Sequence, residues 1–358
     1  MVTSHAKNSY SIGDINISPN VVLAPMEGVT DLSFRRTIRR IGGVGLTCTE
    51  FVPASSLHKN RGQPWETVQF DKDESPVSVQ LYGKDPKEMA EGAKVVESTG
   101  ADICDINMGC PSKRVCSRSG GSALMKDPAL AIEIVAAVKA AIAIPVTVKM
   151  RSGFNHSNRN AAELAYMCQE EGASAVTIHW RTREDRYGGE RNVTQITKAV
   201  QRLSIPVIGN GDIVDIESAK TMFLDTGCAG VMIGRGAIAD PWLPYRISRW
   251  QQGLEPLVVS AKERKEAMFF YFDQIAEAMH SEKGVLGRMK MLSQRFSRAL
   301  PNGEQLRSRL VRSQSTDELR ELATDYFQRL EQMENGNTNV FFNTVFSDVS
   351  PVIAGDRA

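Results

Sequence analysis

One stretch of the chain, Asp102-Ile-Cys-Asp-Ile-Asn-Met-Gly-Cys-Pro-Ser-Lys-Arg114, joins a short apolar run to a sharp turn. The run at 103–106 predicts a buried strand, and Asn107, Gly109 and Cys110 follow it directly. A strand that brings an amide, a thiol and a tight turn to one point is typical of a functional site. Taken alone, the stretch fits a buried cysteine in an ordinary strand-to-loop turn equally well.

The same alternation of apolar run and helical stretch repeats from residue 21 to about residue 250. Asp85-Pro86 and Asp127-Pro128 each predict a helix start, with Asp at the N-cap and Pro at the first helical position. Eight such units favour a (β/α)8 TIM barrel, in the α/β class. The alternative is an open doubly wound sheet, which would need a Gly-rich loop after its first strand, and 24–29 is not one. The predicted strands are 21–24, 46–50, 77–81, 103–106, 146–150, 175–179, 207–209 and 230–233, and the clearest helices are 31–41, 86–98, 128–142, 158–171 and 216–226.

After the barrel the pattern becomes purely helical, which predicts a second, small all-α domain. We expect a catalytic barrel at 1–250, a helical domain at 251–335 and a flexible tail at 336–358. Within 283–312 a single acidic residue, Glu304, accompanies a run of basic ones. Such a segment is typical of phosphate contacts, although a solvated helical face gives the same pattern. The predicted helices are 260–280, 284–299, 303–312 and 316–334, and the basic residues are Lys283, Arg288, Lys290, Arg295, Arg298, Arg307, Arg309 and Arg312.

Composition narrows the class of protein. The 358 residues carry a formal net charge of +1, with 42% hydrophobic and 24% charged residues, as in ordinary globular proteins. The sequence has neither a run of about 18 apolar residues nor the apolar core of a signal peptide at its start. Its six cysteines form no C-x-x-C pair, so neither a zinc site nor a disulfide framework is expected. We expect a cytoplasmic protein with no membrane contact, no metal and no stable protein partner.

Polar or flexible residues follow most of the predicted strands, where TIM barrels carry their chemistry. Positions two apart on a strand share a face, so Lys149 and Arg151 should project together, as should His179 and Arg181. Because buried cations are rare without partners, this convergence predicts an anionic ligand. The Gly-containing turns at 210–212 and 234–236 follow the last two strands, where such barrels commonly bind a phosphate.

Seven motifs in this order resemble the tRNA-dihydrouridine synthases, over roughly residues 21–245. They are Ala24-Pro-Met-Glu-Gly-Val-Thr-Asp31, Asp105-Ile-Asn-Met-Gly-Cys-Pro111, Gly121-Ser-Ala-Leu-Met125, Val148-Lys-Met-Arg151, His179-Trp-Arg-Thr182, Gly209-Asn-Gly-Asp212 and Met232-Ile-Gly-Arg235. Trp180 departs from the family, where a smaller residue is more usual at that position.

The resemblance implies a reaction and a set of roles. The family uses FMN, reduced by NADPH, to saturate the C5=C6 bond of a uridine in tRNA, with hydride added at C6. Cys110 is then the catalytic acid that protonates C5, and the helical domain is the tRNA-binding part. Asn107, Arg151 and Arg181 correspond to substrate-binding residues. The implied FMN-binding residues are Pro25, Met26, Gln80, Lys149, His179, Asn210, Gly211, Asp212, Gly234 and Arg235.

Two other functions fit parts of the sequence. An FMN barrel of the dihydroorotate dehydrogenase kind would act on a free pyrimidine and would not need the basic helical segment. A tRNA-binding module without catalysis would need the basic segment but not Cys110. The sequence does not specify which uridine of the tRNA is reduced.

Overall fold

The computed structural model describes residues 8–57, 62–116 and 120–336. The chain divides into two compact units, Met1–Leu257 and Val258–Ala358. All of the predicted tail except Gly336 lies outside the described residues.

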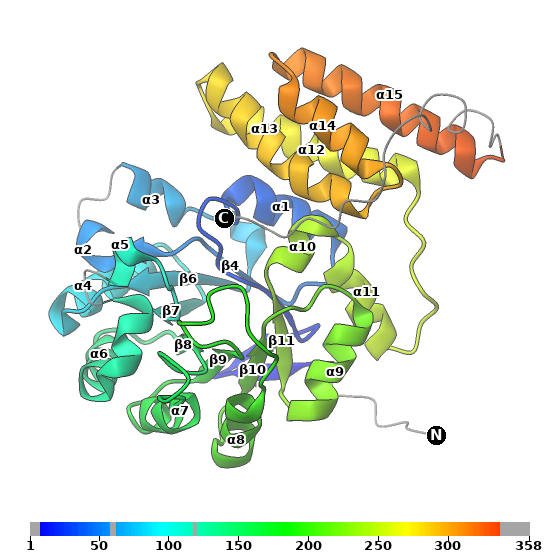
Figure 1. Cartoon of the computed structure of the whole chain (residues 1–358). Coiled ribbons are helices and arrows are strands. Elements are labelled where there is room, and N and C mark those ends of the chain that lie inside the picture. The colour runs from blue at the N-terminus through cyan, green and yellow to red at the C-terminus, as the bar shows by residue number, and fades with distance from the viewer. Residues whose placement is uncertain (1–7, 58–61, 117–119, 337–358) are drawn as a thin grey trace. The chain divides into compact units, whose positions relative to one another are not determined.

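Eight parallel strands of the first unit close into a barrel (Figure 1). Neighbouring strands pair in the order β4-β3-β11-β10-β9-β8-β7-β6, and a further pairing of β4 with β6 closes the ring. The predicted TIM barrel is therefore confirmed, and the open doubly wound sheet is excluded. The barrel strands are β3 (Val21–Leu23), β4 (Leu46–Cys48), β6 (Val77–Tyr82), β7 (Ile103–Met108), β8 (Val146–Arg151), β9 (Ala175–His179), β10 (Val207–Asn210) and β11 (Gly230–Ile233).

Several strands run further than the apolar pattern predicted. Strand β7 continues to Met108, because Asn107 pairs in register with Lys149 and Met108 with Met150 on β8. Polar residues at a strand end look like a loop in the sequence, yet here they stay in the ladder. In the other direction, β4 ends at Cys48, two residues before the predicted end.

Helices cover the outside of the barrel (Figure 1). The predicted caps are confirmed: Asp85 accepts hydrogen bonds from two N–H groups of α4, and Asp127 accepts one from α6. Helix α8 was not among the clear predictions, since it is short and its residues are largely polar. The longer helices are α1 (Leu32–Ile41), α4 (Pro86–Ser98), α6 (Pro128–Ala141), α7 (Ala161–Glu170), α8 (Thr194–Arg202), α9 (Ile216–Thr226) and α11 (Leu243–Gln251). Shorter elements are β5 (Val52–Pro53), α2 (Ala54–Leu57), α3 (Gln63–Thr67), η1 (Lys72–Glu74), α5 (Lys113–Cys116), η2 (Gly121–Lys126) and α10 (Arg235–Ala239).

A small antiparallel hairpin closes the amino-terminal end of the barrel. Its strands are β1 (Tyr10–Ile12) and β2 (Ile15–Ile17). Ile12 and Ile17 are buried in one cluster with residues near the strand starts, including Ile103. Three-residue strands give too little periodicity to be predicted from sequence. Because this end is plugged, we expect ligands to reach the barrel interior from the carboxyl ends of the strands.

The second unit is a bundle of helices around its own core. Tyr271, Phe272, Phe296 and Phe327 are almost fully buried in it. The prediction of helices alone between 260 and 334 is confirmed. Among the described helices of both units, none is long and apolar enough to cross a membrane. The bundle contains α12 (Ala261–Ala278), α13 (Glu282–Phe296), η3 (Ser297–Ala299), α14 (Gly303–Arg312) and α15 (Thr316–Glu334).

Candidate active site

The predicted site residues of four neighbouring strands lie together at the carboxyl end of the barrel, at two levels that are two residues apart along β8. Asn107 pairs in register with Lys149, and Arg151 pairs with His179, which pairs with Asn210. Side chains also meet across strands, since Lys149 Nζ donates to Asn210 Oδ1 at 3.2 Å. Asn210 Nδ2 in turn donates to the Met232 carbonyl of β11 at 2.8 Å, beside the second predicted phosphate turn.

The backbone of Cys110 is held on both sides. Its N–H donates to Asn107 Oδ1 at 2.9 Å, and its carbonyl accepts from the Ser122 N–H at 3.1 Å and the Ser122 hydroxyl at 2.9 Å. Burial raises the pKa of the Cys110 thiol above its ordinary value. The thiol therefore stays protonated at neutral pH, although the residue is only half-buried.

A chain of buried hydrogen bonds runs from Asp105 to the Cys110 loop. Gln80 Nε2 donates to Asp105 Oδ2 at 2.5 Å, and Asn107 Nδ2 donates to Gln80 Oε1 at 2.8 Å. The Asn107 amide oxygen accepts from both Gly109 N–H, at 3.0 Å, and Cys110 N–H. The oxygen of the Asn107 amide and one of its N–H bonds are thus engaged inside the protein, and the contact with substrate that the resemblance implies for Asn107 stays a prediction.

Asp105 was not among the predicted site residues. It is 6% exposed, and its other oxygen accepts from Thr147 Oγ1 at 2.5 Å. Burial raises the pKa of Asp105, whereas the hydrogen bonds from Gln80 and Thr147 and the charge of Lys149 lower it. The signal in the sequence was its place two residues before Asn107, on the same face of a predicted strand.

Arg151 and Arg181, the two buried arginines among the predicted site residues, donate most of their hydrogen bonds to other parts of the protein. Arg151 Nε donates to the Gly109 carbonyl at 3.0 Å, and Arg151 Nη1 donates to the carbonyls of Thr182 and Arg186 at 2.7 and 3.2 Å. Arg181 donates to the Gly188 carbonyl at 2.6 Å. The convergence of cations therefore does not by itself require an anionic ligand, because carbonyl groups satisfy much of their hydrogen-bonding demand.

Asp212 accepts hydrogen bonds from two arginines at the barrel mouth, the carboxyl end of the barrel strands with the loops that follow them. It accepts from Arg181 Nη1 and Nη2 at 2.8 and 2.6 Å, and from Arg235 Nη2 at 2.9 Å. Both Gly211 and Asp212 have positive φ, of 121° and 48°, so the chain turns sharply here. A Cβ on Gly211 would lie 2.4 Å from the ring of Trp180, which is 2% exposed. The unusual Trp180 is thus packed where only glycine leaves room.

His179 is a neutral hydrogen-bond donor. The Arg181 backbone N–H donates to His179 Nδ1 at 3.0 Å, so the ring proton is on Nε2. Burial, followed by the charges of neighbouring Lys149, Arg151 and other cations, lowers the pKa of His179 well below its ordinary value. The imidazole is therefore uncharged at neutral pH.

The remaining predicted residues frame the mouth from the first and last strands. Pro25 and Met26 follow β3, and the Met26 N–H donates to Thr30 Oγ1 at 2.9 Å. A Cβ on Gly234 would lie 3.5 Å from Met26 Sδ, so these two loops adjoin. Tyr187 was not among the predicted site residues, although it lies beside one of them. It is 69% exposed, and the Arg235 guanidinium lies over its ring, 5.0 Å from the ring centre.

The charge of Lys149 makes the mouth suited to an anionic cofactor. Burial, followed by the charge of Arg151, lowers the pKa of Lys149 to about 8. Its ammonium group has three N–H bonds to donate, and Asn210 takes one of them. A bound anion would offset both the cost of burying the Lys149 charge and its repulsion by Arg151, so this part of the site fits an anionic cofactor such as a flavin.

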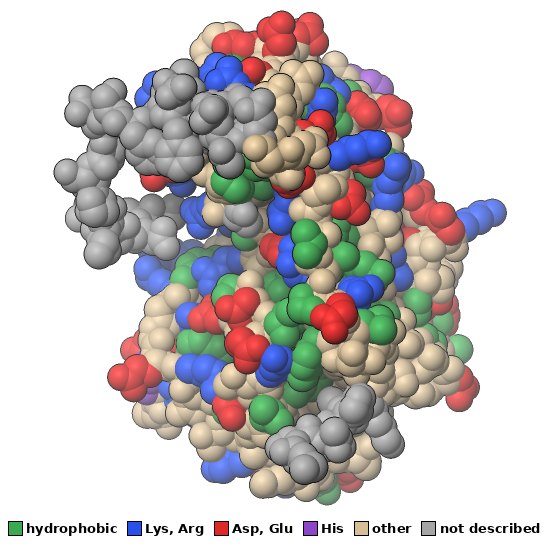
Figure 2. All heavy atoms as spheres, turned by 90° about the vertical axis from the view of Figure 1, so that its right-hand side faces the viewer, with side chains coloured by type: hydrophobic (Ala, Val, Ile, Leu, Met, Phe, Trp, Pro, Cys, Tyr) green, Lys and Arg blue, Asp and Glu red, His purple; other side chains and the backbone are tan. Residues whose placement is uncertain are grey.

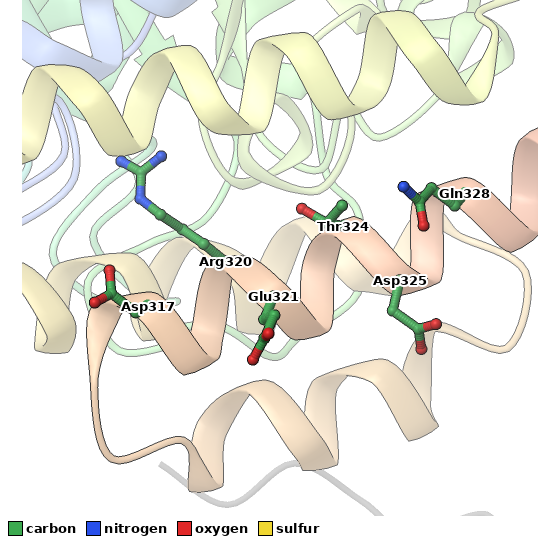
Figure 3. Close-up of a pocket in the computed structure, with 6 residues that line it drawn as sticks. All are labelled: Asp317, Arg320, Glu321, Thr324, Asp325 and Gln328. Atoms are coloured by element: carbon green, nitrogen blue, oxygen red, sulfur yellow. The ribbon is translucent and has the colours of Figure 1, made fainter.

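A pocket on the helical unit differs from the barrel site in being lined largely by acidic residues (Figure 3). It lies on α15 of the helical unit, where Arg320 is already paired with Asp273 at 2.7 Å and Asp325 with Arg329 at 2.9 Å. Three carboxylates among its lining residues make it unsuited to a phosphate or to RNA. The lining residues are Asp317, Arg320, Glu321, Thr324, Asp325 and Gln328.

Known proteins resemble nearly the whole chain. Residues 22–331 match the profile of the family described as "Dihydrouridine synthase (Dus)". A "Probable tRNA-dihydrouridine synthase" of Rickettsia conorii is 38% identical over 83% of this chain and 89% of that one. "tRNA-dihydrouridine synthase B" of Pseudomonas aeruginosa is 37% identical over 86% of this chain and 92% of that one. Among solved structures, morphinone reductase in complex with tetrahydroNAD has a TM-score of 0.48 and 15% identity over 70% of this chain and 91% of that one, which is too distant to support an argument.

Proposed function

The chain belongs to the dihydrouridine synthase family, flavin-dependent enzymes that reduce a uridine of tRNA to 5,6-dihydrouridine, and from this premise we propose how its own residues carry the reaction. We propose that Cys110 is the catalytic acid, that the flavin is FMN, and that NADPH reduces it. We further propose that the protein acts in the cytoplasm, with the barrel as catalytic domain and the helical unit as the part that binds tRNA.

The observation that carries the proposal for Cys110 is a protonated thiol on a backbone fixed from both sides. A proton donor must hold its proton at working pH and be placed within reach of the accepting atom. Burial keeps the Cys110 proton on sulfur, and the bonds to Asn107 and Ser122 fix the backbone from which that sulfur projects. After the proton moves to C5, the raised pKa favours recovery of a proton from water. The thiol is thus ready for the next turnover.

FMN would be held by the donors that surround the mouth. Bound FMN supplies the hydride that adds to C6 of the uracil ring. Lys149 would place a positive charge beside the ring, where it favours added electron density, and neutral His179 would donate through Nε2. The turns at Gly211 and Gly234, together with Arg235, would hold the phosphate. Gln80, whose amide is engaged by Asp105 and Asn107, would contribute mainly by shaping the wall of the site.

The helical unit offers exposed cations for the tRNA backbone. Arg298 and Arg312 are exposed and Arg295 is half-buried, and none of the three has an ion pair with another described residue. Arg307 and Arg309 instead face Glu304 and Asp325, at 3.2 and 4.0 Å. On the face shown in Figure 2, Lys and Arg side chains are interspersed with Asp and Glu. Such scattered cations suit contacts to a folded RNA's phosphates better than a sequence-specific groove.

The test is the formation of dihydrouridine in unmodified tRNA by the purified, flavin-loaded protein, followed by nucleoside mass spectrometry. NADPH and NADH are compared as reductants, and the released flavin is identified by its mass. We expect dihydrouridine with NADPH and release of FMN. The position of the new dihydrouridine in the tRNA then gives the site specificity.

Two outcomes would contradict the proposal. Faster reduction of a free pyrimidine than of tRNA would favour the dihydroorotate-like alternative. Tight tRNA binding without any product, from a protein that carries flavin and is reduced by NADPH, would favour a binding module.

A further inference from the structure

The peptide N–H groups of Gly109 and Cys110 both point at one oxygen, Asn107 Oδ1, at 3.0 and 2.9 Å. A backbone N–H can only donate, so Asn107 must turn its oxygen, not its nitrogen, toward the loop. That choice leaves Asn107 Nδ2 facing Gln80. The orientation of the Asn107 amide thereby determines the orientation of the Gln80 amide.

The same logic continues along β6 and β7. Because Asn107 presents a donor, Gln80 must answer with Oε1, and its Nε2 then faces Asp105. Asp105 accepts on both sides, from Gln80 Nε2 and from Thr147 Oγ1, each at 2.5 Å. Residue register places the three strands level, since Asp105 pairs with Gln80 on one side and with Thr147 on the other. The chain of bonds is consistent in only one direction, and it requires an acceptor at position 105.

We propose that Asp105 is a positioning residue that fixes the amide orientations of Gln80 and Asn107 and thereby holds the Cys110 loop in place. Reversing Gln80 would set its oxygen against Asp105 and its nitrogen against Asn107 Nδ2. Reversing Asn107 as well would set donors against the two backbone N–H groups of the loop. Buried polar groups left without partners are costly, so an acceptor at one end selects a single arrangement of the whole chain. Any effect of Asp105 on turnover rests on the proposed role of Cys110, whereas the positioning of the loop does not.

The test exchanges the acid and the amide between positions 105 and 107. In Asn107→Asp, two carboxylates face the two ends of one glutamine, and Gln80 can satisfy only one of them. The double variant Asp105→Asn with Asn107→Asp makes the chain consistent again. The amide introduced at position 105 donates to Gln80 Oε1, Gln80 Nε2 donates to the carboxylate introduced at position 107, and that carboxylate still accepts from the loop. Asp105→Asn alone is the matched control, because Thr147 can turn its hydroxyl to accept.

The readout is hydrogen–deuterium exchange of the flavin-loaded protein at pH 8, in peptides spanning the N–H groups of Gly109 and Cys110. We expect Asn107→Asp to lower their protection by about tenfold, because the carboxylate introduced at position 107 then faces Gln80 Oε1 or draws Gln80 away from Asp105, and either conflict costs about one hydrogen bond of the chain that holds the loop. We expect the double variant and Asp105→Asn to stay within about threefold of wild type. The rate of Cys110 alkylation by iodoacetamide should follow the same order. A side chain that only fills space would give a double variant no better than Asn107→Asp, and that result would overturn the proposal.

A second pair keeps the inference testable if Asn107→Asp does not fold. Thr147→Val leaves Asp105 able to accept from Gln80, and Asp105→Asn leaves Thr147 able to accept. Together they leave the amide nitrogen introduced at position 105 without an acceptor unless the chain reverses. We expect each single variant to protect the loop and the combined variant to lose protection by about tenfold. Equal protection in all three variants would contradict the proposal. Because exchange needs no turnover, a failure of dihydrouridine synthesis would not be mistaken for a failure of positioning.

Discussion

The arginines of the barrel mouth and those of the helical unit differ in what surrounds their guanidinium groups. Arg151 and Arg181 are 6% and 5% exposed, and both are bonded to carbonyl groups. Arg298 and Arg312 are exposed, with no ion pair to another described residue. Arg151 and Arg181 therefore connect loops at the carboxyl end of the barrel through hydrogen bonds, whereas Arg298 and Arg312 can contact the phosphates of a large ligand.

The difference shows that charge alone does not identify a binding residue. A buried guanidinium donates its N–H groups to fixed partners in the protein, so its removal should mainly lower the stability of the fold. An exposed guanidinium exchanges water for phosphate when RNA binds. Its removal should therefore mainly weaken the dependence of RNA affinity on salt concentration. Substitutions in the two groups of arginines test this difference.

Among these arginines, removal of Arg181 should lower stability the most. Arg181→Met deletes the paired bonds to Asp212 and the bond to Gly188, and leaves both acceptors short of a donor. We expect the free energy of unfolding to fall by about 3 kcal/mol, measured by urea denaturation. The control is Arg191→Met, which removes a half-exposed ion pair to Asp225 and should cost less than about 0.5 kcal/mol. Equal losses in the two variants would show that the bonds of buried Arg181 stabilise the fold no more than the ion pair of Arg191.

Neutralising the helical arginines that have no ion pair with another described residue should affect tRNA binding and leave stability nearly unchanged. For Arg295→Gln, Arg298→Gln and Arg312→Gln together, we expect tRNA affinity to fall by about tenfold at low salt. The slope of log affinity against log salt should become shallower by about two, since each lost phosphate contact removes about 0.7–0.9. Arg307→Gln with Arg309→Gln is the matched control, because these two already face carboxylates. An unchanged slope in the triple variant would show that other residues hold the tRNA.

Lys149 combines burial with a single described partner, and unlike an arginine it can lose its proton near neutral pH. Its pKa is lowered to about 8, so the folded protein without ligand loses this charge as the pH rises past 8. An anionic ligand that needs the charge should then bind up to about tenfold more weakly at pH 9 than at pH 7. FMN titrated into flavin-free protein, followed by its fluorescence, measures this. Lys149→Arg keeps its charge throughout and should give a flat profile; the same decline in that variant would assign the pH effect to another group.

Alternating apolar runs were enough to predict the barrel, because parallel strands buried on both faces give a strong signal. The grouping of Lys149, Arg151 and His179 also followed from their positions on adjacent strands. What could not be predicted was which partner each group finds. The carbonyls that engage Arg151 lie 31 to 42 residues away in the sequence, and peptide groups carry no side-chain signature. Arg309 and Arg298 look alike in the sequence, because no sequence pattern indicates that the Asp325 carboxylate lies 4.0 Å from Arg309.

The proposed reaction depends on Cys110 giving its proton to the uracil ring. The most direct test is the single-turnover rate of dihydrouridine formation from flavin-reduced protein and tRNA, in Cys110→Ala against Cys116→Ala. Cys116 is a half-buried thiol of the same loop, and its contact to the Cys110 carbonyl is duplicated by Ser122. We expect Cys110→Ala to slow the reaction by about 10²–10⁴-fold with tRNA affinity unchanged, and Cys116→Ala to react within a few fold of wild type. Equal rates in Cys110→Ala and wild type would show that another group supplies the proton.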